Sequence, residues 1–311
     1  MFSSQVSQFI EVETLYKLLA PMLEKETSLP VVGYLPPLQE AAIESRHLGL
    51  KTAGEIADLQ NKIKILSEAA QKTIDWPNFA ALFDCPAPAA APCNVPPANV
   101  RIAVARDAAF CFTYAETLEA LQEKGAELCF FSPLEDTALP PNIGGLYLPG
   151  GYPELYAAQL AANTAMRSAV KTAVESGLPT VAECGGFLYL GQTLEDADGK
   201  TYPMAGVLPG QGVKIGRLVR FGYAALTANA DSMLFAAGET LPIHEFHHWD
   251  CTCPGDAFAA EKPTGRRWEC AVASDTLYAG YPHFHFYSYL EFLYSFYDAC
   301  IKDKHRHDGK H

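Results

Sequence analysis

A single cysteine followed by two glycines separates a β-branched run from an apolar segment, in Thr180-Val181-Ala182-Glu183-Cys184-Gly185-Gly186-Phe187-Leu188. The run before the cysteine is typical of a buried strand, and Phe187, Leu190 and Leu194 follow at helical spacing. A strand, a sharp turn with a nucleophile and a helix together make a nucleophile elbow, in which amide N–H groups point at the reacting atom. A helix N-terminus beside a thiol also favours the reactive thiolate. We predict that Cys184 is a catalytic nucleophile; the alternative is a buried structural cysteine at a tight turn.

The elements that must position Cys184 follow a regular pattern. Strands are predicted at 100–105, 127–131, 145–148 and 180–183, and helices at 114–124 and 155–176, each helix ending before a glycine. Alternating strands and helices predict an α/β fold with a mostly parallel sheet flanked by helices. Ligands of such sheets bind beyond the carboxyl ends of the strands, where Gly150, Gly151 and Cys184 fall. Beyond residue 200, glycines and short β-like runs predict added antiparallel strands.

The chain before this pattern has a different character. We expect an amphipathic helix within residues 1–30, a short strand at 31–35 and one or two helices in 54–83, with Asp75 and Pro77 opening the second. Residues 85–99 are rich in proline and alanine and cannot form a core, so they are predicted to be an extended linker. The predicted division is therefore a small piece at 1–84, a linker at 85–99 and a main domain at 100–311.

The net charge, the apolar runs and the cysteines of the chain argue against several classes of function. The formal net charge of −13 argues against nucleic acid or an anionic membrane as a partner. No apolar run approaches the roughly 20 residues of a membrane span, and no signal-peptide pattern opens the chain, so a cytoplasmic location is expected. The nine cysteines form no C-x-x-C pair and no disulfide framework, which indicates reduced thiols.

Three further features could carry chemistry. The stretch from His244 to His248 matches the zinc motif H-E-x-x-H, but Pro242 and the lack of a helical period favour a strand, in which His244 would face away from His247. We therefore predict no metal site. Glu183 could be an acid–base residue beside Cys184, but if the strand continues its side chain points away from the thiol, so an anchoring role is expected. Four arginines are candidates for binding a polycarboxylate: Arg217, Arg220, Arg266 and Arg267.

Several ordered motifs of this chain are similar to those of one enzyme family. They are the strand and loop at 102–112, the Gly-Gly-Tyr-Pro-Glu loop at 150–154, Ala-Glu-Cys-Gly-Gly at 182–186, His-Glu-Phe-His at 244–247, Tyr-Pro-His-Phe-His-Phe at 281–286, and two stretches at 33–36 and 46–50. The main domain resembles triad-type glutamine amidotransferases, which have a class I, flavodoxin-like fold. More closely, nearly the whole chain resembles the cobyrinic acid a,c-diamide synthase family.

This resemblance implies a glutamine amidotransferase, a carbon–nitrogen ligase of cobalamin biosynthesis with glutamine as amido donor. Cys184 would attack glutamine, His283 would act as the base, and N–H groups at Gly150, Gly151 and Gly185 would form the oxyanion hole. The released ammonia would amidate the a and c carboxylates of cobyrinic acid. The wider superfamily has an acid two residues after the histidine, where this chain has His285. The resembled family also lacks that acid, so a Cys–His dyad is expected.

The family uses ATP and Mg²⁺, yet no G-x-x-x-x-G-K-[S/T] loop occurs in the 311 residues. The resemblance implies that residues 1–84 are the C-terminal part of an ATP-dependent synthetase domain. A truncated reading frame and one half of a split enzyme, with a separate P-loop ATP-binding chain as its partner, are both open explanations of the absent loop. Three alternatives stay open: a non-catalytic fragment that binds a tetrapyrrole or a partner, a related acceptor such as nickel-sirohydrochlorin, and a stand-alone cysteine hydrolase on the same fold.

Overall fold

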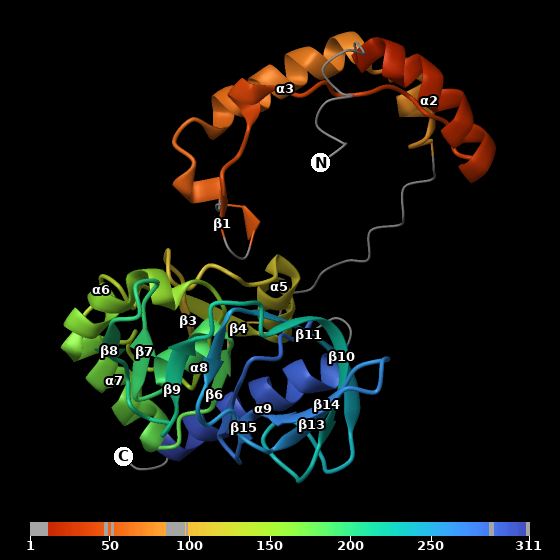
Figure 1. The fold of residues 1–311 in the computed structure, drawn as a ribbon. Helices are drawn as coiled ribbons and strands as arrows, with labels where there is room; N and C mark the ends of the chain where they lie inside the picture. The colour runs from red at the N-terminus through yellow and green to blue at the C-terminus, as the bar shows by residue number, and fades with distance from the viewer. Residues whose placement is uncertain are drawn as a thin grey trace. The chain divides into compact units, whose positions relative to one another are not determined.

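The computed structural model describes residues 12–46, 49–50, 53–84, 97, 99–285 and 289–308. The chain divides into two compact units, residues 1–91 and 92–311 (Figure 1), and each is described by itself. Most of the predicted linker, 85–96 and 98, lies outside the described residues, as does His47 of the 46–50 stretch.

The first unit is mainly helical. Its helices are α2 Val12–Thr27, α3 Leu59–Thr73 and α4 Trp76–Ala81, with short 3₁₀ turns η1 Gln39–Ala41 and η2 Ala53–Glu55 and a pair of two-residue strands, β1 Ser45–Arg46 and β2 Gly49–Leu50. Asp75 caps α4 by accepting a hydrogen bond from the Asn78 N–H, as predicted. The strand expected at 31–35 is wrong: the segment makes one isolated bridge, between Gly33 and Ile74.

A six-stranded sheet forms the centre of the second unit. In spatial order the strands are β15 Val272–Ala273, β16 Leu277–Gly280, β6 Thr180–Glu183, β5 Gly145–Leu148, β3 Val100–Ala105 and β4 Ala126–Phe131. All neighbours pair in parallel except β15 with β16. Every residue of β5 and β6 is buried, because both faces of the sheet are covered. The mostly parallel α/β sheet predicted from the sequence is confirmed.

Helices cover the two faces of this sheet (Figure 1). Ile102, Val104 and Val181 share one core with α5 Ala115–Lys124 and α9 Leu290–Asp308. The alternate strand residues share the other core with η3 Pro153–Tyr156, α6 Ala157–Ala162, α7 Thr164–Glu175 and α8 Gly185–Leu190. The single helix predicted at 155–176 is wrong. It breaks at Asn163, whose side chain accepts a hydrogen bond from the Met166 N–H and caps α7.

Two further sheets extend the second unit, and their strands pair antiparallel, as predicted for the region beyond residue 200, except that β7 pairs with β9 in parallel. One has the order β12-β9-β7-β8, made of Trp249–Cys251, Gln211–Lys214, Thr193–Glu195 and Thr201–Pro203. The other has the order β11-β10-β13-β14, made of Thr240–His247, Arg220–Ala228, Phe258–Glu261 and Arg267–Cys270. Leu194, predicted to extend the helix after the cysteine, belongs instead to β7, because α8 ends at Leu190.

Candidate active site

Cys184 lies at the turn between β6 and α8, at the carboxyl end of the parallel sheet. Its backbone has φ 48° and ψ −98°, a conformation that costs a non-glycine residue about 1–3 kcal/mol and that clusters at functional sites. The surrounding backbone supports this conformation, since the Cys184 N–H donates to the Gly280 oxygen at 2.7 Å and the Gly186 N–H donates to the Pro149 oxygen at 3.1 Å. Strand, strained cysteine and helix together form the nucleophile elbow predicted from the sequence.

The glycine after the turn is required by close packing. A Cβ atom on Gly186 would lie 2.1 Å from the backbone oxygen of Leu148, and no real Cβ approaches a backbone atom so closely. The first turn of α8 therefore rests directly on strand β5, which holds the turn and Cys184 at a fixed depth.

His283 follows strand β16 and lies beside Cys184. Its backbone is fixed by two hydrogen bonds to His244 of β11, with the His283 N–H donating at 2.9 Å and the His244 N–H donating at 3.3 Å. The ring is buried and meets Phe112 edge-to-face, with ring centroids 4.8 Å apart. Burial opposes a charge on this ring. Hydrogen bonds and negative charge from Cys184 and Glu183 outweigh burial and raise the pKa of His283 to about 10.

Glu183 faces His283 from the end of β6. Its Oε2 lies 3.5 Å from His283 Nδ1 and accepts a hydrogen bond from the Tyr147 hydroxyl at 3.1 Å. Its Oε1 accepts from the Phe284 N–H at 3.2 Å, and the side chain is 2% exposed. The expected dyad without an acid is therefore incomplete, because a carboxylate contacts the imidazole from the residue next to the nucleophile in sequence.

The three glycines predicted as an oxyanion hole come together at this site. A Cβ on Gly150 would lie 2.7 Å from His283 Cε1, and a Cβ on Gly185 would lie 3.0 Å from the Gly151 nitrogen. Gly151 has φ +155°, and a Cβ there would meet the Ala109 oxygen at 2.1 Å. Only residues without a side chain fit this arrangement, in which the glycine backbones pack against one another and against the imidazole.

The stretch that matches H-E-x-x-H is a strand, so the helical zinc motif does not apply. In β11, Glu245 and His247 point inward and are buried, whereas His244 and Phe246 lie on the opposite, partly exposed face, as the predicted alternation requires. Burial, and then the charge on His283, lower the pKa of His244. Among the described residues, no group of three or more His, Cys, Asp and Glu side chains is placed to hold a metal ion.

Three of the four candidate arginines line one pocket of about 430 Å³, together with Asp250: Arg217, Arg220 and Arg266. Arg220 lies 3.9 Å from Asp250 and 3.7 Å from the buried Glu245. Arg267 is separate, since it pairs with Glu261 at 2.7 Å on the surface. The structure thus groups positive charge in a chain that is acidic overall.

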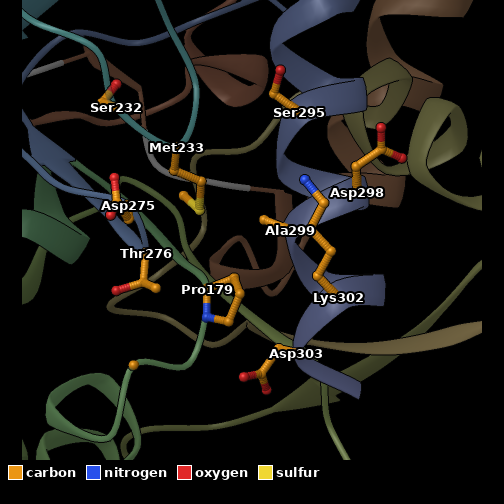
Figure 2. A pocket seen from close by; sticks show the side chains of 11 residues that line it. Pro179, Ser232, Met233, Asp275, Thr276, Ser295, Asp298, Ala299, Lys302 and Asp303 are labelled. Carbon is orange, nitrogen blue, oxygen red and sulfur yellow. The ribbon is translucent and has the colours of Figure 1, made fainter. Parts of the chain in front are cut away.

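A second pocket lies far from this chemistry within the same unit (Figure 2). It has a volume of about 500 Å³ and is lined by residues of α9, among them Asp298 and Lys302, and by Pro179 and Thr276, which immediately precede β6 and β16. It therefore opens at the amino ends of the strands. Cys184 and His283 lie at the carboxyl ends, where ligands of parallel sheets bind.

The fold and the site together define a class of protein: a mostly parallel α/β sheet with a cysteine on a strand–turn–helix elbow and a histidine and a glycine loop beside it. The profile of the CobB/CobQ-like glutamine amidotransferase domain matches residues 101–290, and the chain belongs to this family. Within the described residues, no helix is long and apolar enough to cross a membrane.

Curated relatives that match most of this chain carry the name cobyrinate a,c-diamide synthase. The protein of Dehalococcoides mccartyi strain ATCC BAA-2266 is 41% identical over 284 residues, which cover 87% of this chain and 61% of the relative. That of Salmonella typhimurium is 38% identical over 281 residues, covering 87% and 61%. The chain thus spans about three-fifths of their length. Among solved structures, PurLQS from Thermotoga maritima aligns with 65% of this chain and 98% of its own at 16% identity and a TM-score of 0.46.

Cys184, His283 and the glycines were predicted to share one site, and the structure brings them together. Glu183 was expected to anchor the strand, with an acid–base role as the alternative; the structure places its carboxylate against His283. Tyr147 carried no signal at all, because a tyrosine inside a buried strand is an ordinary core residue.

Proposed function

We propose that this chain hydrolyses glutamine at Cys184 and supplies the ammonia that amidates the a and c carboxylates of cobyrinic acid. The observation that carries this proposal is the strained Cys184 on its elbow with the buried His283 beside it. Family membership and the names of the relatives support the same reaction.

The chemistry follows from the geometry. A charged imidazole beside the sulfur favours the thiolate, which attacks the side-chain amide carbon of glutamine. Backbone N–H groups at Gly150, Gly151 and Gly185 stabilise the oxyanion that forms. His283 then gives its proton to the departing ammonia, leaving a thioester on Cys184. Water, deprotonated by His283, attacks this thioester and releases glutamate.

ATP and Mg²⁺ belong to the proposed overall reaction, but the residues of this chain do not fit them. The glycine-rich stretch at 210–216 includes strand β9 and forms no loop before a helix, so it is no phosphate loop. We propose that residues 1–84 are the C-terminal part of a synthetase domain and that a separate P-loop chain activates the carboxylate. Helix α2 supports this proposal, because none of its residues is buried and apolar side chains such as Leu18 and Met22 are exposed.

The arginine pocket is the place we propose for carboxylate groups of the acceptor. Cobyrinic acid is a polycarboxylate, and this cavity is lined by three guanidinium groups, of which Arg220 is paired with Asp250 and Glu245, so Arg217 and Arg266 supply the positive charge that we propose for its carboxylates. The nickel-sirohydrochlorin alternative carries the same two reacting carboxylates, so this pocket does not distinguish the two acceptors.

The decisive experiment is ammonia release from glutamine by the purified chain without ATP, compared with Cys184→Ala. Loss of release in Cys184→Ala, with release retained in the matched control Cys253→Ala at an exposed cysteine, is the expected result. Release that survives Cys184→Ala would overturn the proposal. If neither protein releases ammonia, the assay is repeated with the P-loop chain added. Ammonia release under these conditions supports the proposal. No ammonia release, together with intact tetrapyrrole binding, supports the non-catalytic binding fragment.

A further inference from the structure

We propose that Glu183 is a positioning residue of this site, holding the His283 ring so that the nitrogen opposite the carboxylate faces the Cys184 sulfur. This inference rests on the proposed glutaminase chemistry and names the third member of its catalytic group. It places the acid immediately before the nucleophile in the chain rather than two residues after the histidine, where this protein has His285.

The carboxylate of Glu183 lies directly beside the imidazole of His283. Oε2 of Glu183 lies 3.5 Å from His283 Nδ1, and both side chains are at most 5% exposed. Because Nδ1 lies on the side of the carboxylate, we infer that the other ring nitrogen, Nε2, is the one that meets the Cys184 sulfur. A carboxylate beside one nitrogen of an imidazole favours one tautomer and one orientation of the ring, which is the role of the acid in a catalytic triad.

The Glu183 carboxylate is itself fixed by two hydrogen bonds. The Tyr147 hydroxyl donates to Oε2 at 3.1 Å, and the Phe284 N–H donates to Oε1 at 3.2 Å. Phe284 is the residue after His283, so the same carboxylate fixes both the ring and the backbone of the histidine segment. A carboxylate with two donors from two different segments has little freedom to turn away.

Glu183 and Cys184 are adjacent in the chain, yet both side chains reach His283. In β6, Val181 and Glu183 point to one face of the sheet, where Tyr147 also lies. Strict alternation would send Cys184 to the opposite face. Cys184 does pack with the core of that opposite face, but its positive φ of 48° turns the chain from the strand into α8, so its thiol lies at the end of the sheet rather than beneath it. The imidazole is then approached by Glu183 and Cys184 together.

The titratable side chains of Tyr147, Tyr114 and His244 around His283 are uncharged, so they do not compete with Glu183 for the imidazole. Burial and then the charge of Glu183 raise the pKa of Tyr147 and of Tyr114, so both hydroxyls keep their protons. Burial, and then the charge on His283, lower the pKa of His244, so this neighbour stays neutral. The negative charge that faces the imidazole therefore comes from Glu183 and Cys184.

The test uses Glu183→Gln, which keeps the shape and removes the charge. We expect the pH at which His283 loses its proton, followed by NMR of the ring, to fall by about 1–3 pH units. We expect kcat for glutamine hydrolysis to fall about 10- to 100-fold with little change in KM, because the residue orients a catalytic group and does not touch glutamine. The rate of Cys184 alkylation by iodoacetamide should change its pH profile in the same variant.

The matched control is Glu245→Gln, a second buried glutamate, which contacts Arg220, His247 and Trp268. It should leave the titration of His283 unmoved. Glu183→Asp keeps the charge and should recover part of the lost kcat, and it replaces Glu183→Gln if that variant does not fold. A His283 titration and a kcat in Glu183→Gln within threefold of the parent protein would overturn the proposal. The titration and alkylation remain readable even if the parent releases no ammonia, so failure of the proposed function is recognised separately.

Discussion

Replacing Gly150 by alanine tests whether the glycine loop and His283 are packed as tightly as the structure shows. The added methyl would lie 2.7 Å from His283 Cε1 and 3.4 Å from Nε2. An ordinary contact begins near 3.4 Å, so the ring or the loop must move by about 0.7 Å. The ring cannot swing freely, because Phe112 lies against it and Glu183 lies 3.5 Å from its Nδ1.

A displacement of this size has a predictable consequence. Misplacing a catalytic group by about 1 Å costs on the order of 100-fold in rate, so kcat for glutamine hydrolysis by Gly150→Ala should fall about 100-fold. The free energy of unfolding should fall by only about 1–3 kcal/mol, as for other overpacked sites. Steady-state ammonia release together with urea denaturation measures both quantities.

The control for this substitution is Gly54→Ala in the first unit, where the added methyl meets no atom within 4 Å and the backbone φ is ordinary. It should leave kcat unchanged. A Gly150→Ala protein that folds and keeps kcat within twofold of the parent would refute the inferred packing of the loop against His283.

Three further predictions concern the Cys184 turn, the His283 pairing and the arginine pocket. Gly186→Ala would place a methyl 2.1 Å from a strand backbone oxygen, so it should unfold the domain or lower its melting temperature strongly, and a thermal melt close to the parent's would contradict this. The raised pKa of His283, about 10, makes a stability contribution that is fully present below about pH 6.5 and is lost as the pH rises toward 10. Urea denaturation of the parent and of His283→Gln should therefore show a difference that shrinks over this range; a constant difference would count against the pairing. The double variant Arg217→Ala/Arg266→Ala should weaken tetrapyrrole binding roughly 10-fold or more, while Arg267→Ala, outside the pocket, should not, as fluorescence titration would measure.

Much of the fold was predictable because it depends on short stretches of chain. Strand β5 was predicted with its observed ends, since a β-branched or apolar run bounded by turn residues has few alternatives. Gly125 ends α5 in the left-handed conformation, which glycine adopts without strain. The helix break at Asn163 was missed, because the apolar spacing continues across it and only the capping contact with Met166 marks the boundary.

The candidate site likewise has parts that the sequence determines and parts that depend on the tertiary structure. The sequence by itself determined the elbow around Cys184, because strand, glycines and helix are neighbours in the chain and their order requires the sharp turn. It also determined the alternation of the His-Glu-Phe-His strand, which has a period of two. Only the tertiary structure decided that Glu183 meets His283, one hundred residues away. The pairing of β16 with β6 brings the segment that carries His283 to the end of β6 and so creates that contact, and long-range pairing leaves no mark in the local pattern of residues.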